Sequence, residues 1–285
     1  MTPLAFALVL SSAVLHAGWN LAAKRSGGGI AFIWLFNALA SVIYAPVALA
    51  VALIARPRIG PIEIAFILGS AALHLTYFVF LQRGYRLGDL SLIYPLARGT
   101  GPCISTAAAI LLLGERPSGL ALAGAATIAV CVFALAGGGA GNVRNSGVAI
   151  RYGLITGAFI ASYTLWDKVA VGTLLIPPLI YDWCNGFSRT VVLAPHALRH
   201  WTEVQGEWVA NRREALIVAV CSPLAYILVL TALSFTPVSY VAPMREIGIL
   251  FGTIAGARFL GEGNARRRVV AAAGMVVGVA ALAIG

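Results

Sequence analysis

The sequence predicts an all-α integral membrane protein, with ten transmembrane helices arranged as two inverted five-helix repeats. Hydrophobic residues make up 60% of its 285 residues, charged residues only 11%, and the mean hydropathy is +0.90. A chain of that composition must present most of its surface to lipid. Apolar runs long enough to cross a bilayer recur along the chain, and one stretch of the first half returns in the second. Such internal repetition indicates one fold unit that is used twice.

Short polar connections separate the apolar runs, each of which has the roughly 20 residues that a spanning helix needs. We expect helices at residues 3–23, 30–54, 61–82, 90–113, 118–137, 147–169, 174–195, 213–235, 237–260 and 266–284. The Gly-rich connection near the middle of the chain divides it into a first repeat, 1–140, and a second, 141–285. The longest connection, 196–213, carries Trp201 and Trp208, and it is expected to hold a short helix at the membrane interface.

The repeated stretch runs from Leu90 to Arg116 and returns from Val238 to Gly263. The first copy reads Pro-x-x-Arg, the second Pro-x-Arg, and both end in Leu-Gly-Glu. Because five spans per repeat is an odd number, the second copy must enter the membrane in the opposite direction. The pseudo-two-fold axis of an inverted repeat brings matching residues together at mid-depth. Arg98 and Arg245 are therefore expected to share one cavity.

Arg98 and Arg245 each lie near the middle of an apolar run, where an arginine costs roughly 2.5 to 3.5 kcal/mol on insertion scales. Two fixed cations at that depth could hold a carboxylate or phosphate bidentately. The structural alternative is a buried ion pair with Glu246. Since Glu246 follows Arg245 directly, their side chains diverge by about 100° on a helix, and Glu246 could instead pair with Arg98, which would leave Arg245 available.

Other polar residues recur at helical spacing on several of the expected helices, and lipid would not tolerate the faces they form. The remaining candidate substrate-binding residues are His16, Asn20, His74, Tyr77, Tyr94, Tyr163, Trp166 and Tyr226. Glu246 is the candidate for coupling transport to protons. The two histidines could also carry protons, although a histidine inside a helix is more often a hydrogen-bonded packing residue.

A further polar group lies on the seventh expected helix, where Asp182, Asn185 and Arg189 are three and four residues apart. An acid and a base two turns apart, with an amide between them, can satisfy one another. We therefore interpret this group as a structural network that closes on itself rather than as part of a binding site.

The layout resembles a known family. The paired proline and arginine helices that end in Leu-Gly-Glu, and a first helix that reads HAGWNLAAK, are similar to the EamA-type branch of the drug/metabolite transporter superfamily. The resemblance covers essentially the whole chain. It implies an alternating-access carrier of small metabolites whose cavity is lined mainly by helices 1, 3, 4, 6, 8 and 9. An arginine in both the fourth and the ninth helix departs from the amino-acid and drug exporters of that branch. It is similar to the related sugar-phosphate and nucleotide-sugar carriers, and this implies an anionic substrate.

The expected function is that of a secondary transporter, which moves a small polar metabolite, anionic or zwitterionic, across the cytoplasmic membrane. The alternative is an exporter of neutral or cationic compounds, such as amino acids or drugs, in which the arginines are structural. An intramembrane enzyme is not expected, because the acids within the spans are few (Asp182, Glu246) and the motifs H-E-x-x-H and G-x-S-x-G are absent. A channel is less expected, because inverted repeats with Gly- and Pro-interrupted helices are typical of carriers.

The net charge of +10 comes mostly from basic residues in short loops. Anionic lipid headgroups, rather than nucleic acid, are the expected counter-charges. The four cysteines lack the close spacing of a metal or redox site, so no cofactor or metal is expected. If the N-terminus is outside, only Arg56, Arg58, Arg116 and Lys168 fall on outer loops, and the positive-inside rule therefore predicts that both termini face outward from the inner membrane. A coupled proton or counter-solute and the oligomeric state stay open.

Overall fold

The structure, a computed structural model, describes residues 1–26, 29–87, 90–136, 146–249 and 265–285. Its elements are α1 (Pro3–Arg25), α2 (Ile30–Ala55), α3 (Pro61–Leu87), α4 (Leu90–Leu112), α5 (Gly119–Ala136), α6 (Ser146–Gly172), α7 (Pro178–Arg199), α8 (Trp201–Phe235), α9 (Val238–Arg245) and α11 (Ala265–Ile284). No strand occurs within the described ranges. The predicted all-α class is confirmed, and most helices begin and end within a few residues of the expected bounds.

Several helices are suited to a membrane. Among the described residues, four are long and apolar enough to cross one: Pro3–Ala23, Ile30–Ala55, Pro61–Leu81 and Trp201–Phe235. Leu96–Leu112, Gly119–Ala134 and Val270–Ile284 are shorter apolar helices. Their outward faces expose large aliphatic side chains, such as Leu53 and Ile54 of α2 and Leu111 of α4. Apolar surface on this scale is unfavourable in water and favourable in lipid. The chain is therefore a multi-pass helical membrane protein.

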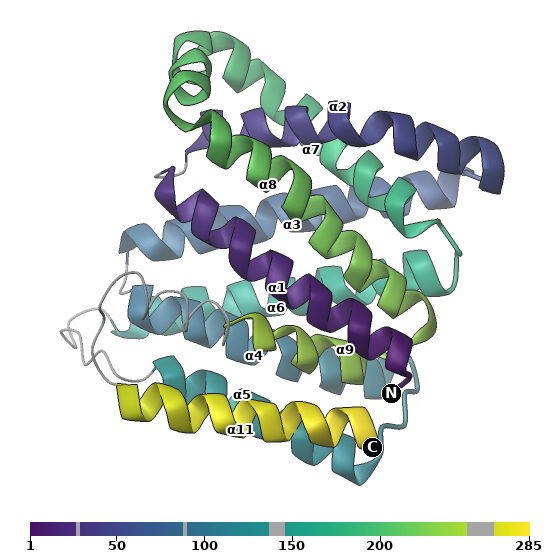
Figure 1. Cartoon of the computed structure of the whole chain (residues 1–285), viewed down its shortest axis with the longest axis vertical. Helices are drawn as coiled ribbons and strands as arrows, with labels where there is room; N and C mark the ends of the chain where they lie inside the picture. The colour runs from purple at the N-terminus through teal and green to yellow at the C-terminus, as the bar shows by residue number, and fades with distance from the viewer. Residues whose placement is uncertain (27–28, 88–89, 137–145, 250–264) are drawn as a thin grey trace.

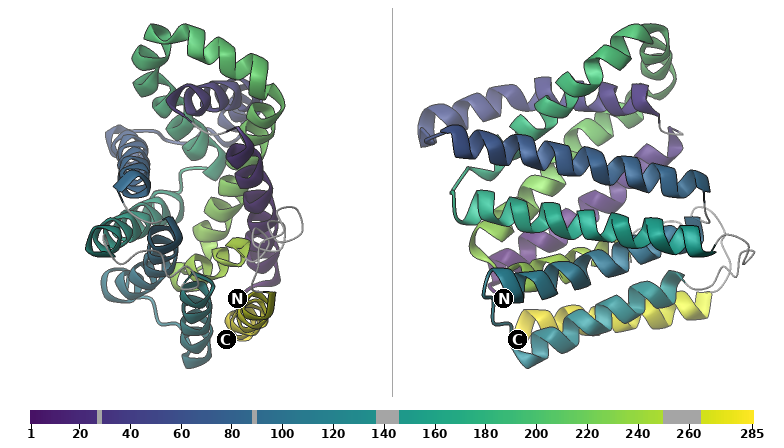
Figure 2. Two further views of the ribbon diagram at one scale, coloured as in Figure 1. Left: turned by 90° about the vertical axis from the view of Figure 1, so that its left-hand side faces the viewer. Right: turned by 180° about the vertical axis from the view of Figure 1, so that it is seen from behind.

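The helices lie side by side with their axes roughly aligned (Figure 1). The pair α5 and α11 forms one edge, and α7 with the first part of α8 forms the opposite edge. α4 and α9 pack against each other in the interior, as the left view of Figure 2 shows along the helices. The two termini meet at one end of the bundle, where the amino group of Met1 donates to the carbonyl of Ala283 at 3.2 Å.

Glycines allow the closest helix contacts. A Cβ added at Gly101 of α4 would lie 2.8 Å from Ile160 of α6, and one added at Gly157 of α6 would lie 2.1 Å from Thr100 of α4. Small residues let helix backbones approach closely in membranes, where van der Waals contact drives association. α4 is helical throughout its length despite its glycines and prolines, so these glycines serve packing rather than bending.

Two helices depart from the expected pattern. α8 joins the predicted interfacial helix to the predicted span, with a kink at Asn211 (φ −127°, ψ 25°) between them. Trp201 and Trp208 are exposed on its first part. α9 was expected to continue to residue 260, but it ends at Arg245, with a turn at Glu246 and helical residues again at 247–249. Residues 250–260 lie outside the described structure. The amide of Glu246 bonds the carbonyl of Pro243 at 3.1 Å, a tight turn that interrupts the α-helical ladder.

The junction between α8 and α9 is held by two charged residues of other helices and loops. The ammonium of Lys168 donates to two carbonyls at the end of α8, at 2.7 and 3.1 Å. The carboxylate of Glu115 accepts from the first two amides of α9, at 2.7 and 2.9 Å. A cation at a helix C-terminus and an anion at an N-terminus both satisfy unpaired backbone groups and complement the helix dipoles. This arrangement positions the start of α9, two turns before Arg245.

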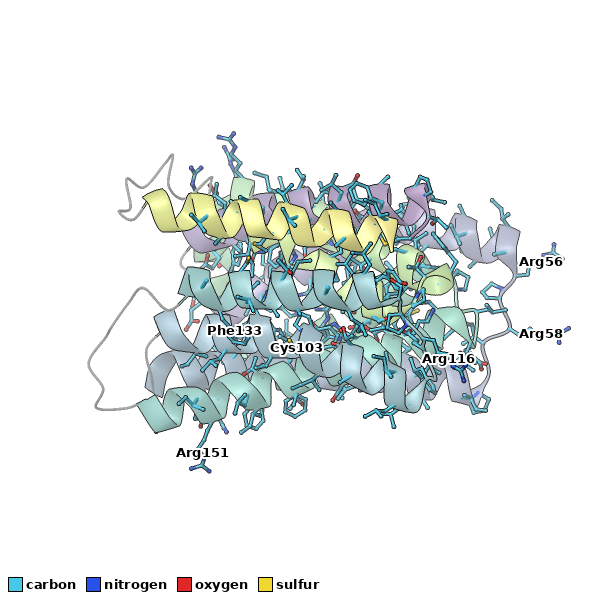
Figure 3. All side chains as sticks on the ribbon, turned by 90° about the horizontal axis from the view of Figure 1, so that it is seen from below. Arg56, Arg58, Cys103, Arg116, Phe133 and Arg151 are labelled. Carbon is cyan, nitrogen blue, oxygen red and sulfur yellow. The ribbon has the colours of Figure 1, made fainter. Side chains whose placement is uncertain are left out.

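The exposed arginines divide between the two ends of the bundle. Arg56, Arg58 and Arg116 lie at one end and Arg151 at the other (Figure 3). The first group shares its end with the chain termini.

Candidate functional site

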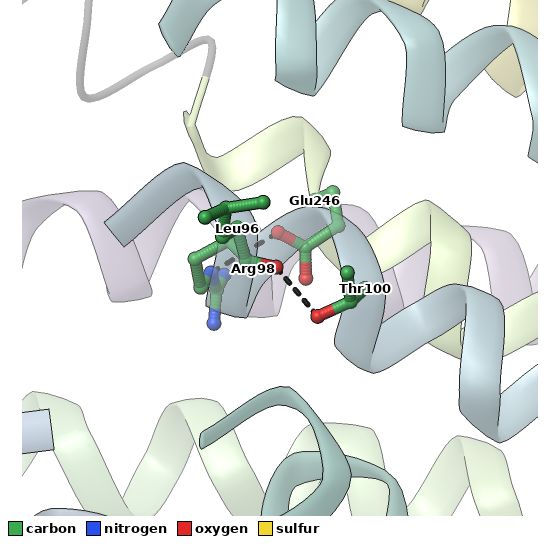
Figure 4. A network of polar contacts seen from close by, with 4 residues as sticks. All are labelled: Leu96, Arg98, Thr100 and Glu246. Atoms are coloured by element: carbon green, nitrogen blue, oxygen red, sulfur yellow. Dashed lines mark hydrogen bonds and ion pairs between the residues drawn. The ribbon is translucent and has the colours of Figure 1, made fainter. Parts of the chain in front are cut away.

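An ion pair between α4 and the end of α9 joins the two halves of the chain (Figure 4). Nε of Arg98, on α4, lies 3.1 Å from Oε2 of Glu246, at the end of α9. Both are buried, with 9% and 4% of their surface exposed. The prediction that Glu246 can pair across to Arg98 is therefore confirmed. Beside the pair, the hydroxyl of Thr100 donates to the carbonyl of Leu96 on its own helix at 2.6 Å, so it does not compete for either charge.

A cavity of about 270 Å³ lies against this ion pair. Its walls come from α4, α5 and α9, and include Cys103, Thr106 and Pro243 besides the two charged residues. The rest of its lining is apolar. Among the described residues that line this cavity, Arg98 and Glu246 are the charged ones.

Arg245 is placed differently from Arg98. Its guanidinium carbon lies 5.6 Å from the centre of the Tyr226 ring, a distance typical of a cation–π contact. Within the described part of the chain, its side chain makes no ion pair and no hydrogen bond. Arg245 is half-buried, and its guanidinium N–H donors remain open to another acceptor.

Asp167 of α6 is the centre of a side-chain hydrogen-bond network that joins four helices. It is fully buried, and Oδ1 accepts from Ser70 Oγ at 2.7 Å and from the Tyr181 hydroxyl at 2.6 Å. The hydroxyl of Tyr226 donates to Oδ2. Three hydroxyl donors from α3, α7 and α8 can together stabilise an ionised carboxylate. Because the same Tyr226 lies under Arg245, this network connects Asp167 to the arginine.

Asp167 was missed by the sequence analysis, which counted only Asp182 and Glu246 as acids within the spans. α6 continues to Gly172, beyond the expected end at 169, so Asp167 lies more than one turn inside the helix. Its spacing of four residues from Tyr163, which was a candidate, was the signal that could have identified it.

Four predicted residues form an aromatic cluster beside this network. His74 stacks on Tyr163, with ring centres 4.2 Å apart, and meets Tyr226 edge-on at 5.5 Å. Nδ1 of His74 lies 2.9 Å from the carbonyl of Ser70, to which it donates when protonated there. Tyr77 meets Tyr163 edge-on at 5.8 Å. The structure therefore brings His74, Tyr77, Tyr163 and Tyr226 together.

The other predicted residues are more scattered. His16 of α1 meets Trp19 edge-on at 4.9 Å. Asn20 is exposed and donates to the carbonyl of its own helix at 2.7 Å. Trp166 lies between α3 and α6, where it stacks on Phe66 and donates to its carbonyl at 2.8 Å. Tyr94 belongs to α4, but its side chain lies outside the described structure.

The predicted closed network on α7 is wrong. Asp182 and Arg189 form neither an ion pair nor a hydrogen bond with each other in the described structure. Nδ2 of Asn185 instead donates to Ser70 Oγ at 2.7 Å. The reason is that Ser70 gives its single proton to Asp167, so its oxygen accepts from the amide, which turns Asn185 toward α3 rather than along its own helix.

No protein-family model matches the chain, and no curated protein matches it. Solved structures do resemble it: one, described only as the crystal structure of a protein, matches with a TM-score of 0.75. The match covers 98% of this chain and 96% of the other, at 17% sequence identity. A likeness at that identity concerns the fold alone. Fold and composition together define the class, a helical membrane protein that crosses the bilayer several times.

Proposed function

We propose that this chain is a secondary transporter of the EamA type, which moves a small organic anion or zwitterion across the cytoplasmic membrane by alternating access. The observation that carries the proposal is Arg245, an arginine in the interior of the bundle whose N–H donors have no partner in the described structure. A charged side chain in the membrane interior costs free energy, so a protein that keeps one there usually uses it in a transport pathway or a binding site.

The packing of the helices supports a ten-helix inverted repeat, with repeats at 1–140 and 141–285. An inverted repeat relates each helix of the first repeat to one of the second: α1 to α6, α2 to α7, α3 to α8, α4 to α9 and α5 to α11. When each helix is exchanged for its counterpart, the contact between α1 and α8 becomes the contact between α6 and α3. The same exchange turns the α2 contact with α8 into that of α7 with α3. Both members of each pair are present. The α2 contact with α7, the α4 contact with α9 and the α5 contact with α11 are unchanged by it. These contacts fit a pseudo-two-fold axis, whereas the α7 contact with α8 has no counterpart of comparable extent between α2 and α3 among the described residues.

The charges around α4 and α9 favour an anion. The described residues of α4 and α9, together with the turn at Glu246, hold two cations, Arg98 and Arg245, and one acid, Glu246. Glu246 neutralises Arg98 directly, and the unmatched charge is that of Arg245. A carboxylate or phosphate placed over Tyr226 can take two parallel hydrogen bonds from a guanidinium. In this proposal Arg245 is the principal ligand of the anion, and His16 and His74 lie beside it.

The interruption of α9 supports a carrier rather than a channel. Discontinuous helices at mid-depth are typical of secondary transporters, where the freed backbone groups face the solute. α9 breaks at Glu246, directly after Arg245. Glu246 is then the candidate for proton coupling, because a proton on its carboxylate would release Arg98. The meeting of the two termini at one end agrees with an even number of crossings, and the positive-inside rule is the argument for proposing that this end faces outward.

A second candidate function is export of neutral or cationic compounds, with the arginines as structural residues. The Arg98–Glu246 ion pair favours it, because an arginine so paired needs no substrate. The two candidate functions make different predictions for Arg245: in the first it binds the solute, and in the second it is structural.

The test is thermal stabilisation of the purified full-length protein by small carboxylates, phosphates, amino acids and cationic drugs. We expect an anion to raise the melting temperature of the wild type by several degrees, since a ligand at one hundred times its Kd adds about 2.7 kcal/mol. Arg245→Gln should abolish the response while it stays folded. The control is Arg151→Gln, which changes an exposed arginine at the end of the bundle and should respond like the wild type.

Arg98→Gln separates the two roles of the arginines. We expect it to lower the melting temperature of the unliganded protein, because Glu246 loses its partner, and to weaken the anion response less than Arg245→Gln does. If neutral or cationic compounds stabilise the wild type, Arg98→Gln and Arg245→Gln equally, the anion proposal is contradicted and the exporter is favoured.

A further inference from the structure

The cavity beside the Arg98–Glu246 ion pair is long and narrow. On α4 its wall extends from Arg98 to Ile110, which is about 18 Å along the helix axis at 1.5 Å per residue. On α5 the wall extends from Leu122 to Val132. A volume of about 270 Å³ spread over that length is a crevice along the helices rather than a round pocket. Its shape therefore suits an extended chain better than a compact ring.

The cavity extends through one half of the membrane thickness. Arg98 lies near the middle of α4, Ile110 lies near its C-terminus, and Leu122 lies in the first turn of α5. The cavity thus begins at mid-depth and ends where α4 connects to α5. Half of a hydrocarbon core of roughly 30 Å is about 15 Å, which is close to the length of the cavity. An acyl chain of one leaflet also lies along the membrane normal, as these helices do.

The mouth of the cavity opens between α4 and α5 onto the surface that faces lipid. The wall residues exposed there are Cys103, Ala107, Leu122 and Ala126. Cys103 of α4 lies next to α5 (Figure 3). Large apolar side chains are exposed around this mouth, among them Leu111 of α4 and Val130 of α5. The cavity is therefore continuous with the lipid-facing surface, and an acyl chain can enter it from the side.

The chemistry of the wall favours hydrocarbon. Apart from Arg98 and Glu246, the described wall residues are apolar except for Thr106. The two charged residues lie at the inner end, where their ion pair neutralises both charges. A charged ligand would find no counter-charge along the rest of the wall. Hydrocarbon in contact with this lining gives its side chains the van der Waals partners that close packing requires.

A cation lies at the outer end of the cavity, where headgroups of the bilayer are expected. Arg116 follows α4 in the connection to α5, and its side chain is exposed at the end of the bundle (Figure 3). It makes no ion pair within the described residues. The acid beside it, Glu115, is directed to α9, where it accepts from two backbone amides at 2.7 and 2.9 Å. A guanidinium in this position can bind a phosphate with two parallel hydrogen bonds.

We propose that a phospholipid binds along α4 and α5, with one acyl chain in the cavity and its phosphate against Arg116. The cavity supplies the apolar wall, and the arginine at its outer end supplies the charge that complements the headgroup. The site is separate from Arg245, so the proposal does not depend on which solute the protein transports. Lipid that only coats the surface would not require this cavity or this arginine.

The experiment measures phospholipid binding to the purified full-length protein by native mass spectrometry. The protein is titrated with dipalmitoyl phosphatidylglycerol, with dihexanoyl phosphatidylglycerol, whose chains are too short to fill the cavity, and with dipalmitoylglycerol, which lacks the phosphate. We expect the long-chain phospholipid to bind, and each analogue to bind roughly tenfold more weakly. Equal binding of the short-chain lipid would contradict the role of the cavity, and equal binding of dipalmitoylglycerol would contradict the role of the phosphate.

A larger side chain in the wall tests the cavity itself. Ala126→Phe places a ring in the cavity from α5, and we expect it to weaken the long-chain phospholipid roughly tenfold. Ala123→Phe is the matched control, because Ala123 is exposed on the same helix but outside the cavity wall. Ala107→Phe repeats the test from the α4 wall, so the result does not depend on the stability of one variant. Equal binding by all three variants would refute the site.

Removal of the cation tests the headgroup contact. We expect Arg116→Gln to weaken the long-chain phospholipid about fivefold, the effect of one basic residue near the membrane surface. It should leave the weak binding of dipalmitoylglycerol unchanged, because that molecule has no phosphate. Arg58→Gln is the matched control, an exposed arginine in another loop at the same end of the bundle. If inorganic phosphate alone raises the melting temperature through Arg116, the arginine binds a free anion and the lipid site is refuted.

Photocrosslinking locates the chain. A phosphatidylglycerol with a diazirine at the end of one acyl chain should label peptides of the cavity wall on α4 and α5, near its inner end. Labels spread evenly over the outer faces of the bundle would show an unspecific lipid coat and would overturn the proposal. Arg245→Gln should bind the phospholipid as the wild type does, so loss of the anion response in that variant leaves this inference intact.

Discussion

α4 and α9 carry the two copies of one sequence stretch, yet the structure uses them differently. Arg98 on α4 is buried in an ion pair with Glu246, whereas Arg245 on α9 lies over Tyr226 without an ion pair in the described structure. α4 is an unbroken helix from Leu90 to Leu112, and α9 ends at Arg245. The glycines next to the arginines differ too. A Cβ at Gly99 would lie 2.6 Å from Phe133, and one at Gly248 would lie 3.4 Å from the nearest atom, the carbonyl oxygen of Ala13.

The difference shows that two copies of one sequence motif can have different structural roles. Among the described residues Glu246 is the acid that forms an ion pair, and it follows α9 but pairs with Arg98 of α4. The pairing leaves the copy on α4 neutral and tightly packed and the copy on α9 charged and interrupted. The second copy is therefore the one suited to bind a solute and to move.

The largest effect should follow from removal of the shared acid. Glu246→Gln removes the buried ion pair with Arg98, and breaking a buried pair typically costs about 3 to 5 kcal/mol. We expect a loss of this size in the free energy of unfolding, measured by denaturant titration in detergent. The control is Glu203→Gln on the exposed first part of α8, which should change it by less than about 0.5 kcal/mol.

The double variant Arg98→Met with Glu246→Leu sharpens this result. Replacement of a buried ion pair by apolar residues of similar volume is often neutral, so we expect most of the lost stability to return. If the single variant Glu246→Gln is as stable as the wild type, the ion pair does not stabilise the protein, and it cannot explain why α4 and α9 differ.

A smaller effect should separate the glycines of α4 and α9. Gly99→Ala forces the far end of the Phe133 ring to move, and because that ring is partly exposed we expect a cost at the lower end of the overpacking range, about 1 kcal/mol. Gly248→Ala meets only an ordinary contact, so we expect a change below about 1 kcal/mol. Thermal unfolding of the two variants side by side measures the difference. Equal losses would contradict the view that α4 is the more tightly packed copy, and Phe133→Leu should partly restore the Gly99→Ala variant.

The smallest effect should come from Tyr226→Phe. It removes one of three hydroxyl donors to Asp167 and weakens the ring contact with Arg245, which together should cost about 1 kcal/mol of stability. Its effect on function should be larger, a several-fold rise in the KM for a transported anion in proteoliposomes. Tyr152→Phe is the matched control, because Tyr152 contacts Phe80 but no acid or arginine among the described contacts. An unchanged KM in the Tyr226 variant would argue that Arg245 is positioned by other groups.

The sequence by itself determined the class of the protein, most helix bounds and the central position of the two arginines. These follow from local pattern: an apolar run of sufficient length forms a helix in lipid whatever its neighbours are, because its backbone groups can pair only within it. The sequence also indicated that Glu246 could pair with Arg98, because adjacent side chains on a helix diverge and Glu246 therefore points away from Arg245.

Only the tertiary structure decided which polar groups found partners. Asp167 takes its donors from α3, α7 and α8, residues 14 to 97 positions away along the chain. Ser70 then draws Asn185 away from Asp182 and Arg189, which leaves those charges open although their spacing suggested a closed network. Spacing along one helix shows which side chains share a face. Which hydrogen-bond partner a side chain finds depends on the hydroxyl protons that its neighbours can donate, and those neighbours come from other helices.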